Sequence, residues 1–129
     1  MGGGDMSGGG GGMEVPAEID SFLADANGYD GSIQDATGQD SVTVAVGGDG
    51  LAFDPPALRI DAGTTVDWEW MGGTHNVAST NDSSSDFDSG DPTSDTDTTF
   101  SQSFDDTGQQ FYLCEVHEGG GMLGAIDVV

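Results

Sequence analysis

Basic residues are almost absent from this sequence. Its 129 residues include 24 acidic side chains, a single arginine (Arg59) and no lysine, for a formal net charge of −23. Without cations to neutralise phosphates, the chain is not expected to bind nucleic acid or an anionic membrane surface. The acidic residues, mostly Asp, occur throughout and indicate a halophilic protein, because molar salt shortens the Debye length to about 3 Å and screens self-repulsion. A mesophilic protein with one acidic face is the alternative.

Long apolar runs are also lacking. No stretch approaches the roughly 18 consecutive apolar residues of a membrane helix, and the N-terminus has neither the basic nor the apolar region of a signal peptide. Hydrophobic residues make up 34% of the chain and concentrate after residue 40. We expect a disordered Gly-rich tail at 1–17, a lead-in segment at 18–39 and one folded domain at 40–129. Residues 19–26 are expected to form a short helix that Asp20 caps and Asn27-Gly28 ends.

The pattern after residue 40 is that of short β-strands. Valines at 42, 44 and 46 alternate with Thr43 and Ala45, as in a strand with one buried face. Further strands are expected at 57–60, 64–70, 76–79, 98–104, 109–114 and 123–129. We expect the strands at 98–104 and 109–114 to form a hairpin, and residues 81–96 to form a long polar loop. Seven or eight short strands predict an all-β fold, a Greek-key sandwich or barrel.

The sequence has one cysteine and two histidines. Because a single cysteine cannot form an internal disulfide, Cys114 is a free thiol, a metal ligand or a nucleophile. Cys114, His117 and Met122 follow a C-x2-H-x4-M spacing between the last two expected strands, and His75 lies on an earlier turn. Taken singly, each residue type is more often a surface or core residue than a ligand. Together they form the ligand set of a type 1 (blue) copper centre, two imidazoles and a thiolate with a weak axial thioether.

A copper centre of this kind predicts an electron carrier that cycles between Cu(I) and Cu(II) and is not an enzyme. A copper delivery or storage protein is the first alternative, although such sites usually expose several Met or Cys side chains. A fragment of a copper oxidase or nitrite reductase would need further histidines, and none remain after His75 and His117. A zinc site would gain little from Met122. The acidic segment 82–97 lacks the glycine placement of an EF-hand loop, so we interpret it as solvated charge.

Four segments of the domain resemble the plastocyanin-like cupredoxins, and most of all the halocyanins of halophilic archaea. They read GGDGLAFDPPALRIDAGTTVDWEW (47–70), HNVA (75–78), FDSG (87–90) and GQQFYLCEVHEGGGMLGAIDVV (108–129). The resemblance extends over residues 40–129, and less specifically over 19–37 with its NGYDG. It implies a cupredoxin fold with one copper ion held by His75, Cys114, His117 and Met122.

The resemblance also implies roles for residues next to the ligands. Asn76 would tie the two ligand loops together, with its backbone N–H directed at the Cys114 sulfur. His117 would be the partly exposed ligand through which electrons pass, and Leu51 would belong to the apolar collar around it, which suits the brief encounters of redox partners. Halocyanins imply a monomer that serves a respiratory or related chain at the outer face of the cytoplasmic membrane. A lipid anchor of the family would need a lipid-bearing cysteine, and the one cysteine here is the predicted ligand Cys114. We therefore expect any lipid anchor to precede this chain.

Two positions depart from the family pattern. Val116 stands where relatives commonly have proline, and Leu113 stands where plastocyanins usually have tyrosine. Unlike proline, Val116 has a backbone N–H, and we expect it to donate to the Cys114 sulfur and so to stabilise Cu(I); otherwise Val116 only packs the loop. Tyr112 should share the side of Cys114 and lie in the core, so the tyrosine route of plastocyanins has no counterpart at Leu113.

Folding should weaken as salt is lowered, because the repulsion among the carboxylates is then unscreened. We expect the melting temperature, followed by circular dichroism, to rise between low and molar KCl. Copper should partly restore stability at low salt, because a ligand that binds only the folded state stabilises it. A melting temperature that stays constant across this range would contradict the halophilic interpretation.

Overall fold

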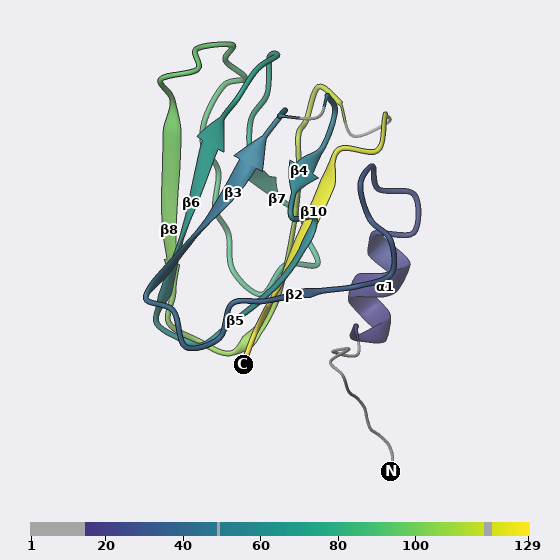
Figure 1. Ribbon diagram of the computed structural model, residues 1–129, viewed down its shortest axis with the longest axis vertical. Coiled ribbons are helices and arrows are strands. Elements are labelled where there is room, and N and C mark those ends of the chain that lie inside the picture. Colours follow the sequence, from purple (N-terminus) through teal and green to yellow (C-terminus); the bar gives the residue numbers. More distant parts are fainter. Residues whose placement is uncertain (1–14, 49, 118–119) are drawn as a thin grey trace.

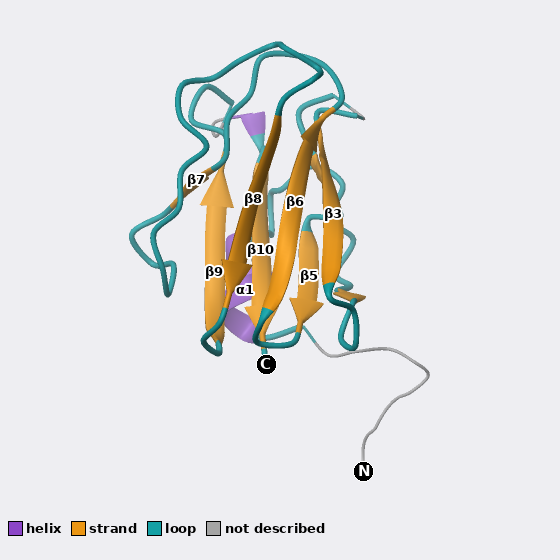
Figure 2. Cartoon of the chain, turned by 90° about the vertical axis from the view of Figure 1, so that its left-hand side faces the viewer, coloured by secondary structure: helices purple, strands orange, loops and turns teal. Residues whose placement is uncertain are grey.

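The computed structural model describes residues 15–48, 50–117 and 120–129, which form two β-sheets packed face to face (Figure 1). The first sheet has five strands in the spatial order β2 (Gln34–Asp35), β5 (Ala57–Ile60), β10 (Leu123–Val128), β9 (Gly108–Leu113) and β7 (Ala78–Ser79). The second has four, in the order β4 (Phe53–Asp54), β3 (Ser41–Val46), β6 (Thr64–Trp70) and β8 (Thr99–Phe104). Figure 2 looks through the four-stranded sheet onto the five-stranded one. The predicted all-β sandwich is confirmed.

The main core lies between the two sheets. In β3 every second residue is buried, as the period of two in a strand requires. Trp68 of β6 is fully buried, and its ring centroid lies 5.3 Å from that of Tyr112 in the opposite sheet. Burial of one large apolar side chain contributes roughly 1.5–3 kcal/mol. Because Cys114 and Met122 belong to the same buried cluster, two of the predicted metal ligands border this core.

A second, smaller core covers the outer face of the five-stranded sheet. It joins residues 15–33 to side chains of β5, β9 and β10. Its buried members are Ile19, Leu23, Ala26, Ile33, Ala57, Phe111 and Ala125. The Phe22 ring packs edge-on against the Phe111 ring, with 5.1 Å between centroids. The five-stranded sheet is therefore covered on both faces, which explains the continuous burial along β10.

The helix of the second core begins earlier than predicted. Helix α1 spans Ala17–Phe22, with Pro16 at its N-cap, whereas we expected residues 19–26. Proline fixes φ near the helical value, and the acidic residues of the first turn stabilise the positive end of the helix dipole. Asp20 does not cap the helix, because it lies within it; its carboxylate instead accepts a hydrogen bond from the Tyr29 hydroxyl at 2.6 Å. The predicted tail at 1–17 lies mostly outside the described residues.

The predicted hairpin between residues 98–104 and 109–114 is wrong. β8 pairs with β6 in one sheet, while β9 pairs with β10 and β7 in the other. Residues 105–107 carry the chain between the sheets. The burial patterns give the reason: β8 is half exposed, as an edge strand is, whereas the middle of β9 is covered by the main core on one face and by the second core on the other.

Arg59, the single basic residue, is paired within the five-stranded sheet. Its Nε and Nη2 both lie 2.9 Å from the Asp127 carboxylate, and the two residues are register partners on β5 and β10. The ion pair cancels the one positive charge, so the surface charge is acidic. Among the described residues, no helix has the length and apolar character that a membrane span needs.

The loops that follow β3, β6 and β9 meet at the upper end of the sandwich in Figure 1. The β3 loop carries Leu51, and the β6 loop carries His75. The β9 loop carries Cys114, His117 and Met122. The fold thus brings together the residues that the sequence spacing singled out.

Candidate metal centre

The backbone of His75 is fixed by three hydrogen bonds. Its N–H donates to the Thr93 carbonyl (3.0 Å), and its carbonyl accepts from the Thr93 N–H (2.9 Å) and from the Trp70 indole Nε1 (2.9 Å). The side chain is 1% exposed. This anchoring restricts the positions that the imidazole can take, independently of any metal.

Glycines make the space for this imidazole. A Cβ on Gly47 or on Gly73 would lie 2.5 Å from Nε2 of His75. The Gly72 carbonyl oxygen and Nε2 of His75 both lie against Gly47, so we assign the ring proton to Nε2, on the side of that carbonyl. Burial, and secondly the nearby His117, lower the pKa of His75, a shift that the hydrogen bond to Gly72 opposes in part. His75 is therefore uncharged at neutral pH, and its Nδ1 presents a lone pair.

The other three predicted ligands share one tightly bonded loop. The Cys114 N–H donates to the Met122 carbonyl (3.1 Å), the His117 N–H to the Cys114 carbonyl (3.1 Å) and the Met122 N–H to the His117 carbonyl (3.2 Å). The loop begins at the end of β9 and ends where β10 begins, so two paired strands hold both of its ends. Cys114 and Met122 are fully buried, and His117 is partly exposed.

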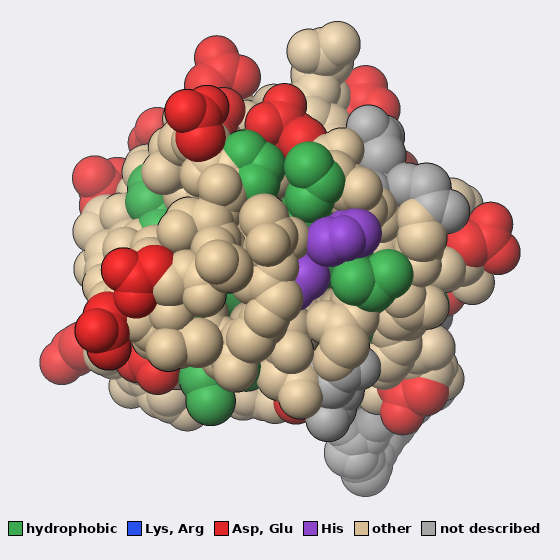
Figure 3. Space-filling model, turned by 90° about the horizontal axis from the view of Figure 1, so that it is seen from above, with side chains coloured by type: hydrophobic (Ala, Val, Ile, Leu, Met, Phe, Trp, Pro, Cys, Tyr) green, Lys and Arg blue, Asp and Glu red, His purple; other side chains and the backbone are tan. Residues whose placement is uncertain are grey.

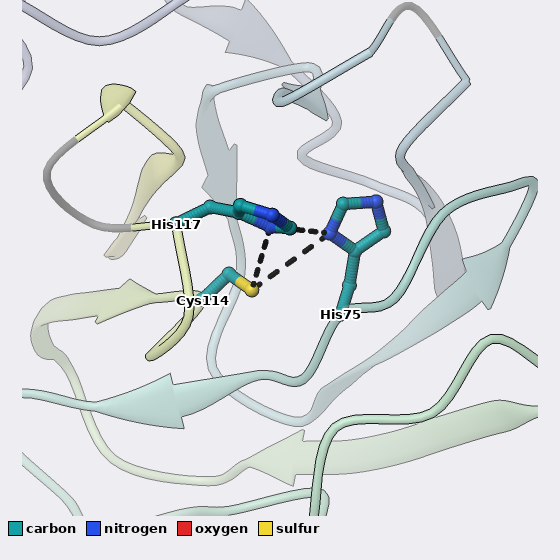
Figure 4. Close-up of side chains that lie close together, drawn as sticks. All are labelled: His75, Cys114 and His117. Atoms are coloured by element: carbon teal, nitrogen blue, oxygen red, sulfur yellow. Dashed lines mark hydrogen bonds between the residues drawn. The ribbon is translucent and has the colours of Figure 1, made fainter.

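The thiol and the two imidazoles lie close together (Figure 4). Sγ of Cys114 lies 3.8 Å from Nδ1 of His75 and 3.7 Å from Nδ1 of His117, and the two Nδ1 atoms are 3.2 Å apart. A triangle with these sides has its centre about 2.1 Å from each corner, close to the roughly 2.0–2.3 Å bonds that zinc, for example, forms with imidazole and thiolate. The three residues therefore fit a metal ion. The position of the Met122 sulfur relative to that ion stays a prediction.

Asn76 joins the His75 loop to the Cys114 loop. Its Oδ1 accepts from the Glu115 N–H (2.8 Å), and its Nδ2 donates to the Glu115 carboxylate (2.7 Å) and to the Gly90 carbonyl (3.2 Å). The Asn76 side chain is fully buried and Glu115 is exposed, so these hydrogen bonds lie at the boundary between the interior and the surface. The ligand loops are thus held together by a side chain that is not itself a ligand.

Only some of the expectations about the residues around Cys114 are confirmed. Tyr112 is fully buried in the main core, as expected, and the Val116 side chain is 54% exposed. In the described part of the chain, the hydrogen-bond partners of the Cys114 sulfur are the two imidazole Nδ1 atoms. The hydrogen bonds expected from the backbone N–H groups of Asn76 and Val116 are not among them and stay predictions.

Comparison with known proteins identifies the family. Residues 40–129 match the sequence profile of the copper binding proteins of the plastocyanin/azurin family. The chain belongs to this family. It is 49% identical to halocyanin from Natronomonas pharaonis over 115 residues, 84% of this chain and 70% of the relative. It is 35% identical to plastocyanin from Scenedesmus fuscus over 96 residues, 67% of this chain and 98% of the relative. Its fold is similar to that of oxidized plastocyanin from Dryopteris crassirhizoma (TM-score 0.59, 20% identity, 68% of this chain and 100% of that one).

The family makes copper the metal of this site. Two imidazoles, one thiolate and a methionine on the same loop match a type 1 centre. The zinc alternative is set aside. Several residues that shape the site were not predicted from the sequence, among them Trp70, Glu115 and the glycines against His75. The Gly-Gly pairs at 47–48 and 72–73 were the available signal, since glycine is needed where another group approaches the backbone closely.

Removal of the thiolate should abolish the blue colour. In the copper-loaded protein we expect intense visible absorption from charge transfer between the Cys114 thiolate and copper, and Cys114→Ser lacks the sulfur that this transition needs. The measurement is a visible spectrum after addition of Cu(II) to both proteins, with circular dichroism as the control for folding. A Ser variant that stays blue would show that the ligand assignment is wrong.

Substitutions at two glycines of one loop distinguish the effect of close packing around Gly72 and His75 from the effect of a positive φ. Gly47 (φ 79°) and Gly50 (φ 92°) both have positive φ, so alanine costs about 1 kcal/mol at either position. At Gly47 the new Cβ would collide with the Gly72 carbonyl oxygen and with Nε2 of His75 (2.5 Å), whereas nothing lies within 4 Å of a Cβ on Gly50. In competition titrations with a chelator, we expect Gly47→Ala to bind Cu(II) about tenfold more weakly than Gly50→Ala. Equal affinities would mean that copper binding does not depend on this packing.

Proposed function

We propose that this protein carries single electrons between redox proteins through a type 1 copper ion bound by His75, Cys114 and His117, with Met122 as a weak axial ligand. The observation that carries the proposal is the donor triangle, which hydrogen bonds and burial hold together. When bound, copper would supply the Cu(I)/Cu(II) couple, since thiolate and thioether favour Cu(I) and imidazole accepts both states. The protein contributes rigidity, because preorganised ligands need little rearrangement when the charge changes.

Electrons enter and leave through His117. Its partly exposed imidazole borders a depression that His75, Leu51 and glycines of two loops also line. Figure 3 shows hydrophobic side chains beside an exposed histidine and acidic side chains toward the margins of this face. The large exposed hydrophobic residues of these loops are Leu51, Met71 and Val116, which we call the apolar patch. A small apolar patch favours brief encounters between redox partners.

The partners that we propose are redox proteins of a respiratory or related chain at the outer face of the cytoplasmic membrane. The 49% identity to halocyanin supports this proposal. We also propose that the protein acts as a monomer, with a copper domain at 40–129 that the lead-in segment at 18–39 precedes. Copper delivery or storage is the alternative function.

A charge placed on the apolar patch should slow electron exchange. We expect Leu51→Glu to lower the rate of electron self-exchange about tenfold, because two patches must meet and like charges oppose each other at contact. The rate is measured by NMR line broadening in mixtures of the Cu(I) and Cu(II) forms, in molar KCl to screen long-range repulsion. Val129→Glu is the matched control, because Val129 is also exposed (49%) but is the C-terminal residue, outside the ligand loops.

The outcomes separate the candidate functions. Fast self-exchange that slows in Leu51→Glu and not in Val129→Glu supports electron transfer through His117. Slow self-exchange in the unmodified protein, together with rapid loss of copper to a chelator, would overturn the proposal in favour of copper delivery. Equal slowing by both variants would show that electrons do not pass through the apolar patch.

A further inference from the structure

Asn27 connects the lead-in segment to two loops of the metal-binding end. Its Nδ2 donates to the Leu51 carbonyl and to the Gly120 carbonyl, both at 2.7 Å. Its backbone N–H donates to the Gly121 carbonyl at 2.9 Å. Leu51 belongs to the apolar patch, and the two glycines directly precede Met122 in the ligand loop. One residue from outside the copper-family match at 40–129 therefore bonds to both loops.

The second core places Asn27 at this point. Leu23 and Ala26, just before it, are buried against the five-stranded sheet. The turn that contains Asn27 is closed by a hydrogen bond from the Tyr29 N–H to the Ala26 carbonyl (3.3 Å), and the Tyr29 hydroxyl donates to Asp20 of α1 (2.6 Å). Burial first, and then the Asp20 carboxylate, raise the pKa of Tyr29 to about 12, so this hydroxyl keeps its proton at ordinary pH. Burial of Leu23 and Ala26, together with the backbone hydrogen bond of the turn, therefore anchors Asn27 to the sheet that holds both ends of the ligand loop.

The lead-in segment and the two loops meet at glycines. Gly121 has a φ of 90°, and a Cβ there would lie 2.8 Å from the Asp25 carbonyl oxygen and 3.2 Å from Oδ1 of Asn27. A Cβ on Gly120 would lie 3.2 Å from Cδ1 of Leu51. Because no side chain fits between these segments, a displacement of one is transmitted to the others.

We infer that Asn27 is a positioning residue for the metal centre. Its carboxamide nitrogen uses both hydrogens, one to hold the Leu51 carbonyl and one to hold the Gly120 carbonyl. An aspartate of the same shape would instead set a carboxylate oxygen against two carbonyl oxygens, because an ionised carboxylate only accepts hydrogen bonds. The amide of asparagine is therefore the group that this junction requires.

The hydrogen bonds of Asn27 act on the metal ligands through Met122, which follows Gly121. Met122 is the next residue, and its backbone bonds to both Cys114 and His117. The inference rests on the proposed function: in the copper-loaded protein, Asn27 keeps the ligand loop closed over the metal and keeps Leu51 beside His117. Loss of the two Asn27 hydrogen bonds should let the ligand loop open more often and release copper faster.

The test compares three variants of the full chain in molar KCl. Asn27→Asp preserves the shape of the side chain and removes both donors, and Asn27→Ala removes the side chain. Tyr29→Phe is the matched control, because it deletes a hydrogen bond of the same segment without touching either loop. Asn27 is exposed and outside both cores, so its variants should fold. Melting temperatures of the copper-free proteins check this.

We expect both Asn27 variants, loaded with Cu(II), to lose copper to EDTA about tenfold faster than the unmodified chain, and Tyr29→Phe to stay within about twofold of it. Amide hydrogen exchange in the copper-free proteins gives a readout without metal. The N–H groups of Met122 and Cys114 should exchange faster in the Asn27 variants and not in Tyr29→Phe.

Equal copper release from Asn27→Ala and Tyr29→Phe would overturn the inference, and so would unchanged amide exchange at Met122. Either result differs from a failure of the proposed function. If the proposed function failed, the unmodified chain itself would form no blue Cu(II) complex, or would exchange electrons slowly and lose copper rapidly. The comparison of amide exchange would still decide whether Asn27 holds the loop.

Discussion

The convergence of one thiol and two imidazoles at the border of an apolar core is the constraint on which the rest of the structure depends. Sγ of Cys114 and the Nδ1 atoms of His75 and His117 lie within 3.8 Å of one another. Burial of polar groups is costly when they lack partners. The chain offsets this cost with bonds that also fix geometry: Trp70 holds the His75 carbonyl, and Asn76 joins the two ligand loops. The metal centre is therefore stiff because its supports are buried and satisfied.

The two cores support different parts of this centre. The main core, between the sheets, includes the side chains of Cys114 and Met122. The second core fixes the outer face of β9 and β10, the strands from which the ligand loop leaves and to which it returns. A sheet covered on both faces has little freedom to bend, because packed interiors resist small displacements. The lead-in segment thus packs directly on the region at 40–129 that matches the family.

Features encoded by nearby residues could be predicted, and features decided by distant contacts could not. Alternation of apolar and polar residues predicted β3, and the spacing C-x2-H-x4-M was enough to place three donors on one loop. The predicted hairpin of β8 and β9 was wrong. Whether consecutive strands pair depends on what covers them, and here the second core covers Phe111 of β9. Asn27 followed by glycine signals a turn. Nothing local indicates that this turn touches Gly120, 93 residues away.

Charge limits how this protein can recognise a partner. Arg59 is paired with Asp127, and the face around the apolar patch carries acidic side chains (Figure 3). In molar salt the Debye length is about 3 Å, so complementary charges cannot steer a partner over long distances as they do at low ionic strength. Apolar contact is short-ranged and is not weakened by screening. Under the proposed function, recognition in high salt then depends on the shape of the patch around His117. Because that shape depends on where Leu51 lies, the hydrogen bond from Asn27 to the Leu51 carbonyl links the lead-in segment to docking as well as to the metal.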